Sequence, residues 1–234
     1  MKTVVIVPTY NERLNIAEAI RRIFESVPDV QVLVVDDASP DGTSAVVRDL
    51  QKTYPRLELF ERPTKDGLGS AYLDAFARVR ADSGIEAVVM MDADLSHDPS
   101  YLPQLLRALE QFDVAIGSRY TRGGGTEGWE PWRRFLSGGG NWYFRMITRV
   151  PIRDCTGGFN VIRISMLNTL PFEKLAMFKG YAFQMALKFF LYRAGARFQE
   201  IPILFRNRTR GESKLSNQII REGLLTPWRL LFHK

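Results

Sequence analysis

Residues 2–37 decide the fold, and they read KTVVIVPTYNERLNIAEAIRRIFESVPDVQVLVVDD. The stretch opens with a nearly unbroken run of β-branched residues at Lys2–Pro8, which is typical of a strand buried on both faces. Asn15–Phe24 then carries apolar residues at helical spacing, and Gln31–Val35 is a second apolar run. Strand, helix and strand in this order predict a βαβ unit with parallel strands.

The same alternation continues along the chain and predicts one α/β domain over residues 1–234, with a mainly parallel central sheet flanked by helices. Further strands are predicted at Leu57–Phe60, Ala87–Met91, Val114–Gly117, Val161–Ile164 and Gln199–Phe205. Further helical periodicity is predicted at Thr43–Lys52, Ser70–Arg80, Tyr101–Gln111, Trp142–Thr148 and Tyr181–Ala194. Arg122–Gly140 contains two glycine triplets and is predicted to be a mobile amphipathic loop.

Composition excludes several classes of protein. With 234 residues, 45% of them hydrophobic and 25% charged, the chain is globular rather than disordered or collagen-like. A single cysteine, Cys155, excludes an intramolecular disulfide and favours a reducing compartment. The two histidines are too few for a clustered zinc site. We find no apolar run long enough for a transmembrane helix and no signal peptide.

The net charge of +6 is divided unequally along the chain. Residues 1–118 carry 12 Lys and Arg against 19 Asp and Glu, a net −7, whereas residues 119–234 carry 20 against 7, a net +13. The basic half is either a solvated face or a surface for phosphates, anionic lipid or nucleic acid. No aromatic ladder or recognition helix accompanies it, so nucleic acid is the weakest of these readings.

Acidic residues follow two predicted strands at their carboxyl ends, where ligands bind in open α/β sheets. Asp92 and Asp94 suit a hard cation, Mg²⁺ or Mn²⁺, that also holds substrate phosphates, although such a tripeptide also occurs on ordinary surfaces. Asp36 and Asp37 suit ribose hydroxyls or a base edge. The alternative is a helix cap formed by Asp37, Ser39 or Asp41. Neither GxGxxG nor GxxxxGK follows the first strand, which argues against a dinucleotide oxidoreductase and a P-loop ATPase.

Arginines dominate the second half of the chain, and their planar forks match phosphate oxygens in pairs. They include Arg119, Arg122, Arg133, Arg134, Arg206, Arg208 and Arg210, joined by Lys214. The segment 206–214 alternates cations with small residues, which predicts an anion-binding loop or, equally, an exposed loop of mixed charge.

Eight motifs together resemble one family over essentially the whole chain. In order they are PTYNE, VVDDASPDGT, KDGLGSAY, MDADLSHDP, GSRY, DCTGGF, GYAFQM and RGESK. This order resembles the family 2 glycosyltransferases of GT-A fold, and within them the polyprenol (dolichol) phosphate mannosyl synthases. The resemblance implies transfer of mannose from GDP-mannose to the phosphate of a membrane polyprenol such as dolichyl phosphate, with inversion and with Mg²⁺ or Mn²⁺. Residues 1–118 would bind the nucleotide sugar and residues 119–234 the acceptor.

The resemblance also implies roles for single residues, carried over by motif. Residues expected to hold the nucleoside are Pro8, Tyr10, Glu12, Asp37 and Lys65. Asp92 and Asp94 would bind the metal and the pyrophosphate, with Ser96 at the place of a further ligand. The lipid phosphate would meet Arg133, Arg134 and Ser137, while Arg208 and Lys214 would clamp phosphates of the donor. Arg119 would contact the donor, and Asp94, Arg119 and Arg134 are the expected catalytic residues.

Two positions depart from the family pattern, since Asn207 and Ala186 stand where relatives often have an acid. A glutamate at 186 would be dispensable if it faced outward; an inward one would mean a changed acceptor or metal geometry. A lipid phosphate is already anionic, so no strong general base is required, and neither His97 nor His233 receives a role.

Membrane contact follows from a lipid acceptor. Candidates for the headgroup region are Trp129, Trp132, Trp142, Tyr143 and Phe144. The tail Leu224–Lys234 is predicted as an interfacial helix or, equally, as a core-packed terminal helix. These features predict a peripheral protein at the cytoplasmic face of a membrane, or one held by a membrane-anchoring partner. The alternatives are another family 2 reaction, such as UDP-glucose to polyprenyl phosphate or transfer to a saccharide, and a non-catalytic nucleotide- or membrane-binding protein.

Overall fold

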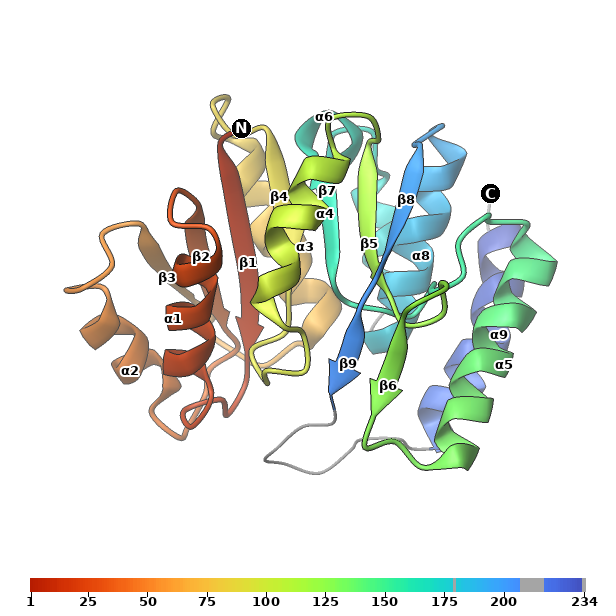
Figure 1. Cartoon of the computed structure of the whole chain (residues 1–234), viewed down its shortest axis with the longest axis horizontal. Coiled ribbons are helices and arrows are strands. Elements are labelled where there is room, and N and C mark those ends of the chain that lie inside the picture. The colour runs from red at the N-terminus through yellow and green to blue at the C-terminus, as the bar shows by residue number, and fades with distance from the viewer. Residues whose placement is uncertain (179, 207–216, 233–234) are drawn as a thin grey trace.

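A seven-stranded sheet forms the centre of the molecule, in the order β3-β2-β1-β4-β7-β5-β8 (Figure 1). The structure is a computed structural model that describes residues 1–178, 180–206 and 217–232. The strands are β1 Thr3–Thr9, β2 Gln31–Asp36, β3 Leu57–Glu61, β4 Ala87–Met90, β5 Val114–Ser118, β7 Asn160–Arg163 and β8 Phe198–Pro202. All neighbours pair in parallel except β7, which runs antiparallel to β4 and β5. The sheet is therefore mainly parallel, as predicted.

Helices cover both faces of this sheet (Figure 1). They are α1 Ile16–Ser26, α2 Thr43–Leu50, α3 Leu68–Arg80, α4 Leu102–Ala108, α5 Pro131–Thr148, α6 Ile164–Leu167, α7 Phe172–Leu175, α8 Gly180–Arg193 and α9 Asn217–Phe232, with a 3₁₀ turn at Pro99–Tyr101. Alternate residues of β1 point to opposite faces: Val5 and Val7 pack with α1, α2 and α4, whereas Val4 and Ile6 pack with α3 and α8. The first βαβ unit is thus formed as the sequence predicts.

The prediction of a loop over Arg122–Gly140 is wrong for most of its length. Gly125–Glu127 forms strand β6, and α5 already begins at Pro131, so the glycines at 138–140 lie inside a helix. Proline fits the first turn of a helix, and the buried side chains of Asn141 and Phe144 hold α5 against the body of the protein. Tertiary packing here outweighs the poor helix propensity of glycine.

The predicted strand Gln199–Phe205 is two strands in two sheets. Strand β8 ends at Pro202, and β9, Leu204–Arg206, pairs with β6 in a separate two-stranded sheet. This small sheet lies beside the carboxyl ends of the central strands, at the lower edge in Figure 1. Helix α9 packs on α5 and α8 with Leu230 buried, while Phe232 is exposed. One side of α9 therefore packs in the core, while another side is exposed at the surface.

Candidate functional site

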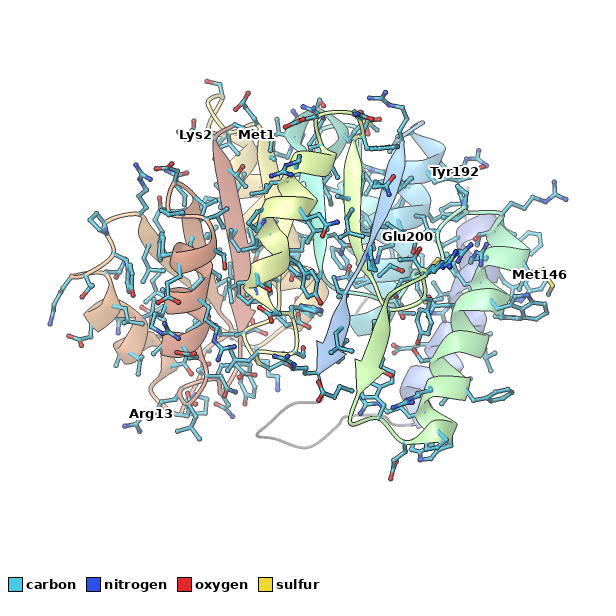
Figure 2. The ribbon with its side chains drawn as sticks, viewed as in Figure 1. Met1, Lys2, Arg13, Met146, Tyr192 and Glu200 are labelled. Carbon is cyan, nitrogen blue, oxygen red and sulfur yellow. The ribbon has the colours of Figure 1, made fainter. Side chains whose placement is uncertain are left out.

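The carboxyl ends of β1, β2 and β4 carry three residues with left-handed backbone that are not glycine. They are Asn11 at φ 61°, Ala38 at φ 57° and Leu95 at φ 64°, each a few residues after its strand. The left-handed conformation is energetically unfavourable for residues with a side chain, and residues that adopt it cluster at functional sites. Arg13 marks this edge of the sheet in Figure 2, opposite to Met1 and Lys2.

The loop after β1 holds two residues that are predicted to bind the nucleoside, Tyr10 and Glu12. The Lys65 ammonium lies 3.4 Å from the centre of the Tyr10 ring. Glu12 accepts a hydrogen bond from the Asn15 amide at 2.8 Å, and its backbone N–H donates to Thr43 Oγ1 at 3.1 Å. Pro8 pairs with Val35 inside the sheet. The predicted neighbourhood of Lys65 and Tyr10 is therefore present, while their contact with a nucleotide stays a prediction.

The two acids after β2 have different structural tasks. Asp36 accepts hydrogen bonds from the hydroxyls of Thr9, Ser39 and Ser44, at 2.9, 2.7 and 2.9 Å. Asp37 accepts from the backbone N–H of Gly67 at 3.1 Å and forms a buried ion pair with Arg62. Arg62 also reaches Asp74 at 2.8 Å, and sequence analysis gave it no role. Asp37 is thus fixed in place, and it is not the N-cap residue of α2, which is Gly42.

Asp92 and Asp94 follow β4, and local hydrogen bonds hold both. The buried Asp94 accepts from the backbone N–H of Ser96 at 3.0 Å and from its hydroxyl at 2.6 Å. The backbone N–H of Asp92 donates to His97 Nδ1 at 3.1 Å, and the Asp92 side chain retains 29% of its surface. Ser96 therefore serves Asp94 as a donor, and its place as a further metal ligand stays a prediction.

The two carboxylates fit a hard divalent cation. No group of three or more acidic, histidine or cysteine side chains suited to a metal occurs within the described ranges. The protein would supply two carboxylates and leave the other positions to phosphate oxygens and water, as is usual for Mg²⁺. Space beside Asp92 is kept by Gly158, where a Cβ would lie 3.6 Å from both carboxylate oxygens of Asp92 and 3.3 Å from the His97 ring.

His97 is a site residue that sequence analysis missed. Its ring is buried, stacks on Phe159 at 5.1 Å and meets Phe205 edge-on at 5.5 Å. Burial lowers the pKa of His97, so the ring is neutral at pH 7 and can accept the Asp92 hydrogen bond. The sequence gave no signal for His97, because its role is to accept the hydrogen bond of the Asp92 backbone N–H, and this contact forms only in the folded chain.

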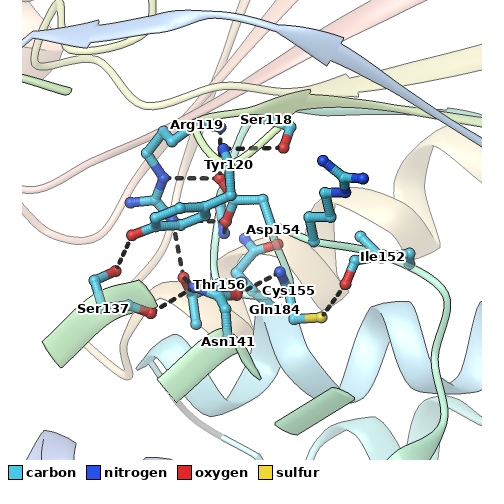
Figure 3. A network of polar contacts seen from close by, with 12 residues as sticks. Ser118, Arg119, Tyr120, Ser137, Asn141, Ile152, Asp154, Cys155, Thr156 and Gln184 are labelled. Carbon is cyan, nitrogen blue, oxygen red and sulfur yellow. Dashed lines mark hydrogen bonds and ion pairs between the residues drawn. The ribbon is translucent and has the colours of Figure 1, made fainter. Parts of the chain in front are cut away.

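A buried ion pair joins Arg119, after β5, to Asp154 (Figure 3). The guanidinium donates to both carboxylate oxygens, at 2.8 and 2.7 Å, and to the Thr156 hydroxyl at 2.8 Å. Burial acts to raise the pKa of Asp154, but Arg119 prevails and holds that pKa at about 2. Gly157 leaves room for this carboxylate, since a Cβ there would lie 3.1 Å from it. Arg119 is thus oriented by Asp154, and its contact with a donor stays a prediction.

Helix α8 holds the segment 154–158 through hydrogen bonds from a buried lysine. The fully buried Lys188 ammonium donates to the carbonyls of Gly157 at 2.6 Å and Cys155 at 3.4 Å. Burial lowers the pKa of Lys188 to about 8. Gln184 accepts from the Asn160 amide at 3.0 Å. Ala186, one of the two departures from the family pattern, is fully buried in the apolar cluster that α8 shares with α3.

The residues expected to meet the lipid phosphate lie on the first two turns of α5. Ser137 accepts a hydrogen bond from the Tyr120 hydroxyl at 2.6 Å, and Arg133 stacks on Trp129 at 4.1 Å. Arg134 is exposed. Trp129 and Phe144, which were expected in a lipid headgroup region, are buried instead, so that expectation is wrong for these two.

Strand β9 ends beside Ser96 and Asp98, which follow the acidic pair in the sequence. The backbone N–H of Arg206 donates to the Ser96 carbonyl at 3.4 Å, and its guanidinium lies 3.8 Å from Asp98. Predicted residues Arg208 and Lys214 lie outside the described residues, as do Asn207 and His233.

Comparison with known proteins gives a consistent result. The family model described as Glycosyl transferase family 2 matches residues 4–171. An undecaprenyl-phosphate mannosyltransferase of Micrococcus luteus is 39% identical over 98% of this chain and 95% of its own length. A polyprenol monophosphomannose synthase of Mycolicibacterium smegmatis is 42% identical over 95% of this chain and 84% of its own.

Solved structures share the fold at low sequence identity. Glucosyl-3-phosphoglycerate synthase from Mycobacterium tuberculosis superposes with a TM-score of 0.69 at 18% identity, over 98% of this chain and 79% of the other. A mannosyltransferase from Pyrobaculum calidifontis, in complex with GDP-Man and Mn²⁺, superposes with a TM-score of 0.60 at 21% identity, over 98% and 72%. The predicted GT-A fold is confirmed, and the chain belongs to glycosyl transferase family 2.

Proposed function

We propose that this glycosyltransferase moves mannose from GDP-mannose to the phosphate of a membrane polyprenol, with inversion, giving polyprenyl phosphate mannose and GDP. Its likeness over nearly the whole chain to relatives named for polyprenol and undecaprenyl-phosphate mannosyl transfer carries the proposal. The complex of a structural neighbour with GDP-Man and Mn²⁺ supports the choice of donor and of a divalent cation, Mg²⁺ or Mn²⁺.

The positions of the site residues support a donor site in the acidic half of the chain and an acceptor site in the basic half. Tyr10, Asp37 and Lys65 belong to the acidic half and would hold the nucleoside, while Asp92 and Asp94 would hold the cation. A cation bound there would neutralise charge on the leaving diphosphate. The basic half contributes Arg119 and the first turns of α5. The sheet brings the two halves together, because β7 of the basic half lies between β4 and β5 of the acidic half.

The chemistry asks for positioning more than for acid–base catalysis. A phosphate monoester is anionic at neutral pH and can attack the sugar without losing a proton, provided that cations bring two anionic substrates together. Arg133, Arg134 and Ser137 would orient the attacking phosphate, and Arg119, held by Asp154, would face the donor. Buried His97 would act by fixing Asp92 rather than by exchanging a proton with substrate.

We also propose a peripheral position at the cytoplasmic face of a membrane. No helix in the described part of the chain is long and apolar enough to cross a bilayer. Helices α5 and α9 lie side by side (Figure 1). Both expose large apolar residues. Those on α5 and α9 are Trp132, Phe135, Trp142, Met146, Leu224, Leu225, Trp228, Leu231 and Phe232. A membrane-anchoring partner would use the same face.

A panel of labelled donors tests the reaction. GDP-mannose, GDP-glucose and UDP-glucose are each incubated with the enzyme, Mn²⁺ and polyprenyl phosphate, and the label is measured after extraction into organic solvent. We expect label in the organic phase from GDP-mannose, at a rate at least tenfold above the others. Transfer chiefly from UDP-glucose would replace the donor assignment, and label that stays in water with every donor would refute the lipid acceptor.

A further inference from the structure

A pocket of about 300 Å³ lies along α5, and none of the acidic residues that follow the strands lines it. It opens between this helix and the segments that follow β5 and precede β7. Its lining consists of Tyr120, Gly138, Asn141, Trp142, Arg145 and Arg153. Two arginines and no acid line it, so it is strongly cationic. None of the residues assigned to the donor, the cation or the acceptor phosphate belongs to this lining.

The two arginines bring charged donors that other described residues do not use. The Nε atom of Arg145 is buried and has no hydrogen-bond partner in the described part of the chain. Arg153 uses its backbone N–H, which donates to Glu200 at 2.9 Å, and its guanidinium forms no ion pair within the described ranges. A desolvated donor of this kind normally has a partner in native proteins.

Tyr120 and Asn141, two neutral polar side chains of the lining, are already engaged. The Tyr120 hydroxyl donates to Ser137 Oγ at 2.6 Å, and the Asn141 amide donates to the Ser137 carbonyl at 2.8 Å. The recognition chemistry therefore belongs to the two guanidinium groups. Planar guanidinium groups match the oxygens of a phosphate, which points to a phosphate group as the ligand.

The surface beside the pocket indicates where this phosphate comes from. Trp142 lines the pocket and is 61% exposed, and Phe135 and Met146 on the same face of α5 are 84% and 57% exposed. Met146 projects outward from α5 at the edge of the molecule (Figure 2). A cationic pocket next to an apolar stripe fits a ligand with a charged head and apolar chains.

We propose that this pocket binds the phosphodiester headgroup of an anionic phospholipid while the apolar stripe contacts the acyl chains. It is a second phosphate site whose lining differs from the acceptor site at the start of α5, and Tyr120 and Asn141 of the lining contact Ser137 of that neighbouring site. The proposal does not depend on which sugar is transferred or on whether transfer occurs. It assigns a defined headgroup contact to this surface, whereas diffuse positive charge alone would give only nonspecific attraction to an anionic membrane.

The test is vesicle binding without substrates. Full-length protein is titrated with vesicles of phosphatidylcholine containing phosphatidylglycerol, and with vesicles of phosphatidylcholine alone. Arg145→Gln is compared with Arg149→Gln, which removes an equal charge one turn later on the surface. Gly138→Ala places a methyl group in the pocket, 3.7 Å from the Tyr120 ring, without changing charge, and Gly139→Ala is its control in open space. Thermal melting verifies that each variant is folded.

We expect Arg145→Gln to weaken binding to the anionic vesicles by more than about tenfold, the loss of a charge-assisted hydrogen bond. Arg149→Gln should weaken it by at most about fivefold, the share of one diffuse surface charge. Gly138→Ala should weaken binding and Gly139→Ala should not. If Arg145→Gln is poorly folded, the glycine pair decides alone.

Two results would overturn the proposal. Equal losses for Arg145→Gln and Arg149→Gln, with no effect of Gly138→Ala, would show diffuse electrostatic attraction and no pocket. Inorganic phosphate added at millimolar concentration distinguishes a lipid from a free anion. If it binds the protein in the absence of vesicles and the Arg145→Gln variant loses that binding, while the vesicle affinity is unchanged, the pocket takes free phosphate and the lipid assignment fails.

Discussion

Two buried side chains, His97 and Lys188, hold the backbone around the acidic pair without being part of it. His97 accepts a hydrogen bond from Asp92, and Lys188 donates to the carbonyls of the segment that keeps Gly158 beside Asp92. His97 acts through the backbone N–H of Asp92, and Lys188 acts mainly through the carbonyl of Gly157. Replacing either side chain should therefore change both the free energy of unfolding and the geometry of the site.

Replacing His97 with phenylalanine tests the first of these contacts. The phenyl ring can keep the stacking on Phe159 but leaves the Asp92 N–H without its acceptor, which should lower the free energy of unfolding by about 1–3 kcal/mol. His97→Asn keeps an acceptor near the position of Nδ1 and should recover part of the loss. Urea denaturation measures both, and equal stability of His97→Phe and the wild type would refute the role.

Lys188 makes stability depend on pH in a defined direction. Its pKa is about 8 in the folded protein and 10.5 as an ordinary lysine, so between these values the unfolded chain binds more protons. The cost of burying the charge is present in full below pH 8 and disappears as the pH rises to 10.5. The wild type should therefore gain on the order of 3 kcal/mol relative to Lys188→Met over this interval. A constant difference in urea unfolding would contradict this.

Single residues also mark the limit of sequence reasoning. Asp92 and Asp94 were predictable because two acids directly follow a buried apolar run. The role of Lys188 was not predictable, because nothing in an almost wholly apolar helix shows that its ammonium donates hydrogen bonds to two carbonyls about 30 residues earlier. The partners of Asp37 and Asp154 were equally hidden, since Arg62 and Arg119 reach them only after the chain has folded.

At the scale of elements, α5 is where local propensity and tertiary packing disagree. Its glycines at 138–140 predicted a loop, yet the helix continues through them. The βαβ elements of the first half were predictable because propensity, periodicity and burial agree there. The separation of β8 from β9 was not, because it depends on pairing with β6, about 80 residues earlier.

Alanine at one of these glycines should strengthen α5. Gly140 is exposed, and a Cβ there would meet nothing within 4 Å, so Gly140→Ala should stabilise the protein by about 0.5–1 kcal/mol. Gly124 is the contrast, because a Cβ there would lie 2.4 Å from the Ser118 carbonyl. Gly124→Ala should destabilise. Thermal unfolding measures both, and a fall in Tm for Gly140→Ala would contradict the account of this helix.

At the scale of the whole molecule, the charge and the apolar surface are both unevenly placed. The net charge of +6 combines an acidic half, to which we assign the nucleotide and the cation, with a basic half, to which we assign phosphate. Exposed aromatic residues gather on α5 and α9 within that basic half. Family membership and fold followed from the order of the motifs, whereas this surface needed the structure, because buried Trp129 and exposed Trp132 look alike in sequence.

Removing apolar side chains from this face should release the protein from membranes. Phe135 and Phe232 are 84% and 73% exposed, so the double change Phe135→Ser and Phe232→Ser should leave Tm nearly unchanged. Binding to mixed phosphatidylcholine and phosphatidylglycerol vesicles should fall at least tenfold, since each ring loses its burial in lipid. Met177→Ser, at a site outside both helices that is 60% exposed, is the control. An equal loss in the control would contradict the assigned face.

The central claim is that Asp92 and Asp94 serve mannosyl transfer to a polyprenyl phosphate. The most direct measurement is the initial rate of label transfer from GDP-mannose to polyprenyl phosphate, with Mn²⁺, for the wild type, Asp92→Asn, Asp94→Asn and Asp82→Asn. Asp82 supplies the same change of charge beside Lys2, at the opposite edge of the sheet. We predict that Asp92→Asn and Asp94→Asn fold normally and that their initial rates fall by about 100-fold or more. Without both carboxylates the site would hold the cation poorly, and charge on the leaving diphosphate would not be neutralised. Asp82→Asn should match the wild type, and an Asp94→Asn enzyme with wild-type rate would contradict the account.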